Sequence, residues 1–179
     1  MHWFWNFGIY VLCYPIIQVL STMRHEGLHA LAAWFEGAKI KKISVLPKMR
    51  KIDGNKRLTW GFIEYDYPFG ERRTMWVPLA PHICMPLVVM STSVVLLLGN
   101  FSYHIWAILT IFGIISPFID FTANYFFRYK RSKCGDFLSA EISMKYRKSD
   151  FKKRFRYLST ATWLSTFVGL GIAIWTMPV

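Results

Sequence analysis

Long apolar runs alternate with polar, strongly basic stretches along the chain. The apolar runs cover residues 3–35, 75–98, 104–127 and 157–177. A membrane-spanning helix needs about 20 predominantly apolar residues, so each run is long enough to cross a bilayer. The first run is longer than a bilayer requires, and we expect it to tilt or to bend near Pro15. The pattern predicts an all-α polytopic membrane protein with about four transmembrane helices, forming one membrane domain over residues 1–179.

The pattern changes to alternation of apolar and polar positions in residues 38–67. Two alternating segments flank Asp53-Gly54-Asn55, a sequence typical of a tight turn. We therefore expect a β-hairpin insertion between the first and second membrane helices. An edge strand from Leu58 to Tyr65 could hold an extended peptide by strand addition. The alternative is a solvated basic loop.

Two further features lie between and within the later apolar runs. Asp136 is expected to cap a short amphipathic helix. The apolar positions of this amphipathic helix are Phe137, Leu138, Ile142 and Tyr146. The last apolar run contains no charged residue, and its Gly169 and Gly171 are expected to let it pack closely against another helix.

Charge is distributed unevenly, and this distribution predicts an orientation in the membrane. The chain has 22 Lys and Arg against 10 Asp and Glu, with 54% hydrophobic residues. Eleven of the basic residues lie between Arg24 and Arg73, and eleven lie between Arg128 and Arg156. With four spans, both loops are on one side, which the positive-inside rule makes cytoplasmic. We expect an integral protein of a prokaryotic cytoplasmic membrane that contacts anionic lipids and binds no nucleic acid.

One short motif in the first apolar run has a spacing that suits metal chemistry. It reads His25-Glu26-Gly27-Leu28-His29. On a helix, His25 and His29 project from the same face and can bind one metal ion. Glu26 lies about 100° further round the helix, where its carboxylate can take a proton from water without being a ligand. The motif predicts a zinc-peptidase site on a helix that ends near Gly37.

These residues resemble the site-2 protease family of intramembrane zinc metalloproteases. The resemblance covers most of residues 20–125: the motif with its small residues, Gly37 and the hairpin, the proline-rich second run around Ala80-Pro81-His82, and an aspartate in the third run. It implies a three-helix catalytic core with two histidine ligands and an aspartate ligand from the third core helix. It also implies cleavage of transmembrane protein or peptide substrates within the bilayer.

Asp120 and Asp136 compete for the place of the third metal ligand. Asp120 lies eight residues before Arg128, about 12 Å deep at 1.5 Å per residue. His29 and His25 precede Gly37 by eight and twelve residues, about 12 to 18 Å, so their depths match that of Asp120. We therefore expect the metal ligands to be His25, His29 and Asp120, with Asp136 as the alternative. His82, alone in the second run, is more typical of a structural histidine, and its role stays open.

The sequence thus predicts a zinc metalloendopeptidase with Glu26 as general base and its active site toward the cytoplasm. Zn²⁺ is the expected cofactor. Two other functions stay open. One is a catalytically inactive membrane protein that binds zinc or regulates a partner, and the other is a membrane scaffold in which the motif is accidental.

Overall fold

The computed structural model describes residues 2–52, 55–59, 61–67, 75–132, 135–146 and 150–178. The chain divides into two compact units, Met1–Glu71 and Arg72–Val179. The first unit contains one long helix and four short strands, and the second contains helices. The expectation of a single membrane domain stays a prediction.

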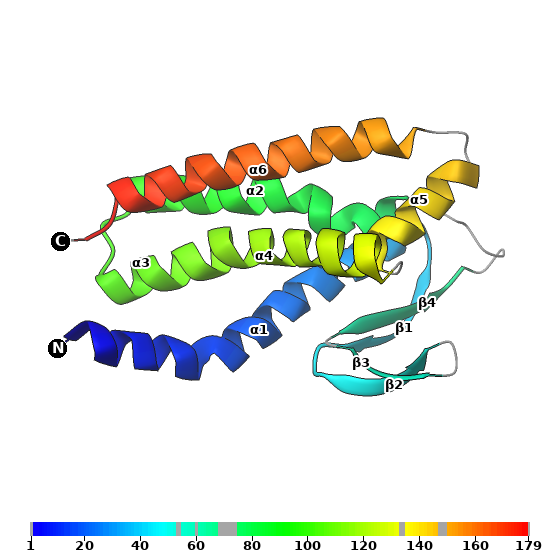
Figure 1. Cartoon of the computed structure of the whole chain (residues 1–179), viewed down its shortest axis with the longest axis horizontal. Coiled ribbons are helices and arrows are strands. Elements are labelled where there is room, and N and C mark those ends of the chain that lie inside the picture. Colours follow the sequence, from blue (N-terminus) through cyan, green and yellow to red (C-terminus); the bar gives the residue numbers. More distant parts are fainter. Residues whose placement is uncertain are drawn as a thin grey trace. The chain divides into compact units, whose positions relative to one another are not determined.

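The first unit begins with the long helix α1 (His2–Phe35), which continues through Pro15. Figure 1 shows that α1 changes direction along its length. The helix ends at Gly37, whose φ of 81° is in the left-handed region. The Gly37 amide donates to the Trp34 carbonyl, and the Ala38 amide donates to the Ala33 carbonyl, both at 2.9 Å. This pair of bonds is the Schellman arrangement, so the predicted end of the helix at Gly37 is confirmed.

The four strands of the first unit form two antiparallel pairs (Figure 1). They are β1 (Lys39–Ser44), β2 (Lys48–Ile52), β3 (Asn55–Thr59) and β4 (Phe62–Asp66). Strand β2 pairs with β3, and β1 pairs with β4. Ile52 lies opposite Asn55, which confirms the predicted hairpin, although Asp53 and Gly54 lie outside the described residues. The single edge strand predicted from Leu58 to Tyr65 is wrong, because this segment is divided between β3 and β4 with Gly61 between them.

Three helices of the second unit are long and apolar enough to cross a membrane, among the residues described. They are α2 (Trp76–Leu98), the continuous helix Tyr103–Arg131, and α6 (Phe151–Trp175). The middle one consists of α3 (Tyr103–Thr110), the π-helical turns η1 (Ile111–Ile115), α4 (Ser116–Ala123) and the π-helical turns η2 (Asn124–Arg131). These helices match the second, third and fourth predicted apolar runs. The total of four spans stays a prediction.

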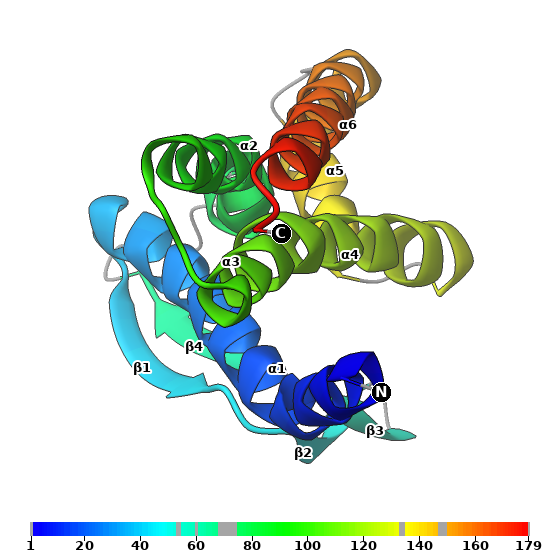
Figure 2. The ribbon, with the colours of Figure 1, turned by 90° about the vertical axis from the view of Figure 1, so that its left-hand side faces the viewer.

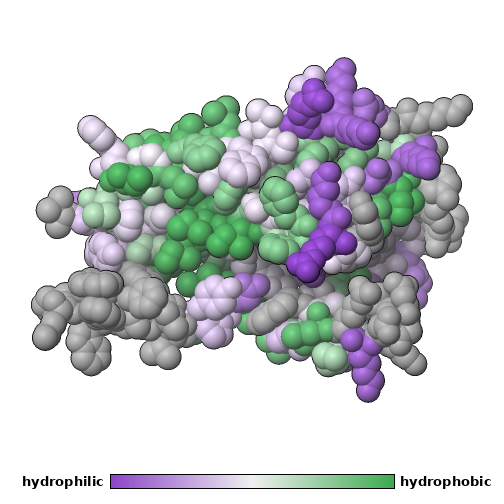
Figure 3. Space-filling view, in the orientation of Figure 1, coloured by the Kyte–Doolittle hydropathy of each residue, from purple (hydrophilic) through white to green (hydrophobic). Residues whose placement is uncertain are grey.

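Helix α6 begins six residues earlier than the apolar run that predicted it. The Asp150 carboxylate accepts a hydrogen bond from the Lys153 amide at 3.1 Å, which caps the helix in front of the basic run. The first turns of α6 therefore carry Lys152, Lys153, Arg154 and Arg156. Figure 3 shows hydrophilic side chains gathered where α6 begins and hydrophobic ones along the middle of the unit's helices.

Helices α2 and α6 pack side by side, as Figures 1 and 2 both show. A Cβ at Gly169 would lie 2.9 Å from Val89 Cγ1 and 3.0 Å from Ser93 Oγ, so the missing side chain allows this approach. A Cβ at Gly171 would meet nothing within 4 Å. The predicted close contact is confirmed at Gly169 and is wrong at Gly171.

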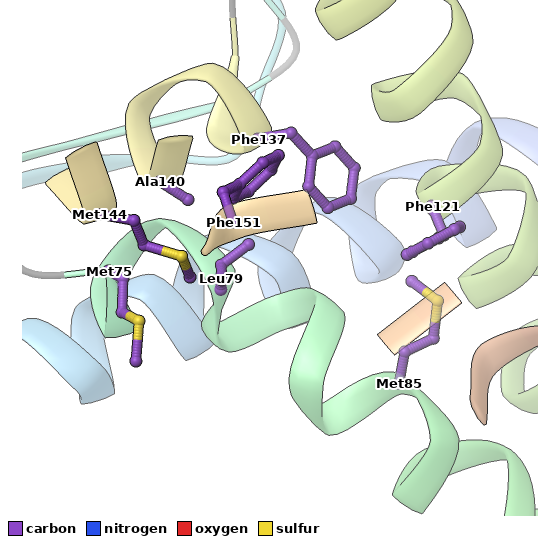
Figure 4. Close-up of a cluster of buried hydrophobic side chains, with 8 residues drawn as sticks. All are labelled: Met75, Leu79, Met85, Phe121, Phe137, Ala140, Met144 and Phe151. Carbon is purple, nitrogen blue, oxygen red and sulfur yellow. The ribbon is translucent and has the colours of Figure 1, made fainter. Parts of the chain in front are cut away.

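The short helix α5 (Asp136–Tyr146) closes a core at one end of the second unit (Figure 4). The core residues come from α2 and the residue that precedes it, and from α4, α5 and α6: Met75, Leu79, Met85, Phe121, Phe137, Ala140, Met144 and Phe151. The predicted helix is confirmed. Of its predicted apolar positions, Phe137 is buried, Leu138 is half-buried and Ile142 is 43% exposed, and the side chain of Tyr146 lies outside the described residues. The buried face also includes Ala140 and Met144, which were not predicted. The side chains at 137, 140 and 144 form one stripe at helical spacing, which packs α5 onto α2.

Candidate metal centre

Helix α1 brings His25 and His29 together, as the spacing predicts. Their Nε2 atoms lie 3.1 Å apart, and their rings meet edge to face with centroids 4.7 Å apart. Two zinc–nitrogen bonds of 2.0–2.1 Å at a tetrahedral angle place the two nitrogens about 3.3 Å apart. The distance therefore suits a shared metal ion, with a change of a few tenths of an ångström. A hydrogen bond between the two rings is the other arrangement that this distance allows.

The three polar residues of the motif are buried, although their side chains can ionise. His25, Glu26 and His29 are 8%, 8% and 6% exposed. A buried carboxylate or imidazole is unfavourable unless it pairs, donates or coordinates something. The cluster lies within a helix whose sequence otherwise predicts a membrane span. Its burial is consistent with a site sheltered from bulk water.

Gly61, between β3 and β4, lies directly against Glu26. A Cβ at Gly61 would be 2.6 Å from Glu26 Oε1 and 2.6 Å from Thr22 Cγ2, both too short for any side chain to fit without movement. The strand segment therefore passes over the face of α1 that carries the proposed base. Gly61 was not among the predicted site residues, although a glycine inside an alternating segment is itself a signal of close backbone approach.

Two further contacts lie near the end of α1, one joining α1 to the residue after β4 and the other joining β1 to β4. The Tyr67 hydroxyl donates to Glu36 Oε2 at 3.1 Å, which joins the residue after β4 to the end of α1. Lys41 of β1 forms an ion pair with Asp66 of β4. The first contact holds the end of β4 near α1, whereas the ion pair joins two side chains that are both more than half exposed and contributes little to stability.

Asp120, the predicted third ligand, lies on α4 in the second unit. Its Oδ1 accepts a hydrogen bond from Asn124 Nδ2 at 3.1 Å, and Asn124 Oδ1 accepts one from Arg128 Nη1 at 3.4 Å. These residues form a chain at four-residue spacing along one helix face. The contacts connect the Asp120 carboxylate to a cation through the Asn124 amide.

Asp136, the alternative ligand, forms a pair with His82. Its Oδ2 lies 3.2 Å from His82 Nε2, and the His82 side chain is fully buried. The His82 ring stacks on Phe137, with centroids 4.4 Å apart, and meets the edge of Phe121. Asp136 is the first residue of α5, where the helix dipole also favours a carboxylate. The buried His82 is thus held by an acidic partner 54 positions away, a pairing that sequence reasoning did not find.

The structure brings together the two predicted histidine ligands and places Glu26 beside Gly61, all within the first unit. Asp120 and Asp136 belong to the second unit and have different polar partners there. The place of either one in the ligand set stays a prediction. No family model, curated protein or solved structure matches this chain.

Proposed function

We propose that the protein is a zinc-dependent endopeptidase that hydrolyses peptide bonds of membrane-embedded substrates. The observation that carries the proposal is the 3.1 Å separation of the His25 and His29 Nε2 atoms on a helix that also buries Glu26. Two imidazoles and a nearby carboxylate at this spacing are the donors that zinc peptidases use. The three apolar helices of the second unit support a membrane location.

His25 and His29 would hold the ion, together with one carboxylate from the second unit. A catalytic zinc site takes three protein ligands and keeps one position open. Depth along the predicted spans favours Asp120 for the third position. The contacts within the second unit favour Asp136, because a carboxylate that binds metal is commonly oriented by a hydrogen bond from a second residue, here His82. Asp120 is instead engaged with the Asn124 amide of its own helix.

Glu26 is the proposed general base and acid. Zinc, when bound, supplies a Lewis acid that polarises the scissile carbonyl and makes water more acidic. The Glu26 carboxylate accepts the proton of the attacking water and then delivers it to the leaving amine. Because Glu26 is only 8% exposed, the proton is held within the site until the amine leaves.

Strand β4 supports an extended mode of substrate binding. Among the described strands, β4 pairs only with β1, so its other edge has backbone groups that can pair with a peptide. Gly61 immediately precedes β4 and adjoins Glu26. A substrate segment added to β4 would have its backbone close to the proposed base, in the extended form that hydrolysis of a helical segment requires.

The test is zinc content and peptide hydrolysis of the purified protein in detergent or vesicles. We expect about one zinc ion per chain, as catalytic zinc sites hold, and hydrolysis of an added membrane peptide that depends on Glu26. A chain that binds no zinc would overturn the proposal. Stoichiometric zinc without hydrolysis of any membrane peptide would favour the inactive zinc-binding protein instead.

A further inference from the structure

A cavity of about 200 Å³ lies in the second unit where α2 and α6 begin and α5 crosses them. Apolar side chains from all three helices line it, among them Trp76, Leu79, Ile83, Met144 and Leu158. Leu79 and Met144 are buried at its base, whereas Trp76 is 50% exposed. The cavity is thus an apolar slot that opens to the surface.

Arg154 is the one charged residue among those that line the cavity. Its side chain is exposed, and Nη1 lies 3.8 Å from the sulfur of Met75, a weak acceptor. Within the described part of the chain, no carboxylate forms an ion pair with it. The guanidinium therefore presents donors at the mouth of the slot that an anion can use.

The cavity lies at the basic end of α6, which the charge distribution predicts to be at the membrane surface. Lys152, Lys153 and Arg156 are exposed on the same turns of this helix. Figure 3 shows hydrophilic side chains gathered where this helix begins. Phosphate headgroups lie at this level of a bilayer, and acyl chains begin just below it. A guanidinium also matches the geometry of phosphate oxygens with paired donors.

We propose that this cavity binds an anionic phospholipid, with one acyl chain in the apolar slot and the phosphate on Arg154. An apolar lining with a single cation at its rim is complementary to a molecule that has an acid at one end and a hydrocarbon chain behind it. The remaining basic residues of α6 attract the anionic membrane surface in general, whereas Arg154 selects the bound lipid. The proposal does not depend on the peptidase activity.

Native mass spectrometry of the detergent-purified full chain tests the proposal. Phosphatidylglycerol and phosphatidylcholine with the same acyl chains are titrated separately. We expect one molecule of phosphatidylglycerol to bind per chain, more tightly than phosphatidylcholine does. Arg154→Gln should weaken phosphatidylglycerol binding about fivefold, since one cation near the headgroup contributes about 1 kcal/mol. Lys152→Gln, on the same exposed helix turn but outside the lining, is the matched control and should bind as the wild type does.

A second variant tests the apolar part of the site. Ile83→Phe fills the slot and should reduce binding of the whole phospholipid, while glycerol phosphate, which has no acyl chain, should bind the same to both proteins. Equal losses in Arg154→Gln and Lys152→Gln would show diffuse charge attraction and overturn the proposal. So would unchanged phospholipid binding by a folded Ile83→Phe protein, or tighter binding of a free fatty acid than of phosphatidylglycerol.

Discussion

Among the described residues, a buried polar pair, His25 and His29, and a partly buried one, His82 and Asp136, arise in different ways. His25 and His29 are four residues apart on one helix, and the periodicity of α1 alone brings their Nε2 atoms to 3.1 Å. His82 and Asp136 are 54 residues apart, and their contact depends on α5 packing against α2. The first pair is a local consequence of sequence, and the second is a consequence of tertiary packing. The variants below test whether the local pair, the distant pair or both hold a metal.

The largest effect is expected when the local pair is removed. In His25→Ala/His29→Ala, a site that needs three protein ligands retains one, so zinc and hydrolysis should both be lost. Metal content by elemental analysis and hydrolysis of a membrane peptide measure this. Stoichiometric zinc in the folded double variant would show that the metal does not bind at His25 and His29 of α1.

Glu26→Gln separates metal binding from catalysis at the same helix turn. The amide retains the shape of the side chain and loses its basicity, so hydrolysis should fall by about 10² to 10⁴-fold. Zinc content should stay as in the wild type. A variant that hydrolyses peptide at the wild-type rate would show that Glu26 is not the base.

The distant pair is tested by comparing Asp136→Ala with Asp120→Ala. If Asp136 is the third ligand, its variant loses zinc while Asp120→Ala retains it, and the reverse result assigns the ligand to Asp120. His82→Ala should then weaken zinc binding about 10 to 100-fold through Asp136, and His82→Gln, which retains a donor, should recover part of the loss. Competition with a zinc chelator measures the affinities. Unchanged zinc affinity in both His82 variants would show that the His82–Asp136 pair has only a structural role.

Alanine substitutions at Gly61 and Gly27 compare a glycine that lies against Glu26 with one that has open space beside it on the same helix as Glu26. Gly61→Ala places a Cβ against Glu26 and Thr22, and a displacement of the base by about 1 Å can lower the rate about a hundredfold. Gly27→Ala adds a Cβ where nothing lies within 4 Å and should leave hydrolysis unchanged. Rates at equal zinc content distinguish the two. Equal rates in both variants would show that the strand does not constrain Glu26.

Alanine substitutions at Gly169 and Gly171 compare a glycine that lies against α2 with one that faces open space. The expected effect is the smallest, and it is on stability. Gly169→Ala forces α6 away from α2 and should destabilise the protein by about 1–3 kcal/mol, as overpacking does. Gly171→Ala faces open space and should be neutral or stabilise the helix by up to about 1 kcal/mol. Thermal unfolding in detergent measures both. Similar melting temperatures for the two variants would contradict the close contact at Gly169.

Features that depend on neighbouring residues were predicted from the sequence. The apolar runs predicted α2, the Tyr103–Arg131 helix and α6, because hydrocarbon length and backbone hydrogen bonding require long helices. Gly37 predicted the end of α1, and the alternation around residues 53–55 predicted the β2–β3 hairpin. The HExxH spacing predicted that His25 and His29 meet, since 3.6 residues per turn places them on one face.

Features that depend on distant residues were decided by tertiary structure. Which face of α5 is buried could not be predicted, because apolar character alone does not distinguish Ile142, which is exposed, from Ala140, which is buried. The contact of Gly61 with Glu26 depends on how β4 is held against α1. The partner of His82 depends on where α5 begins, and no periodicity relates positions 82 and 136. Side chains close in sequence meet through helix geometry, whereas side chains far apart meet only where packing of whole helices and strands brings them together.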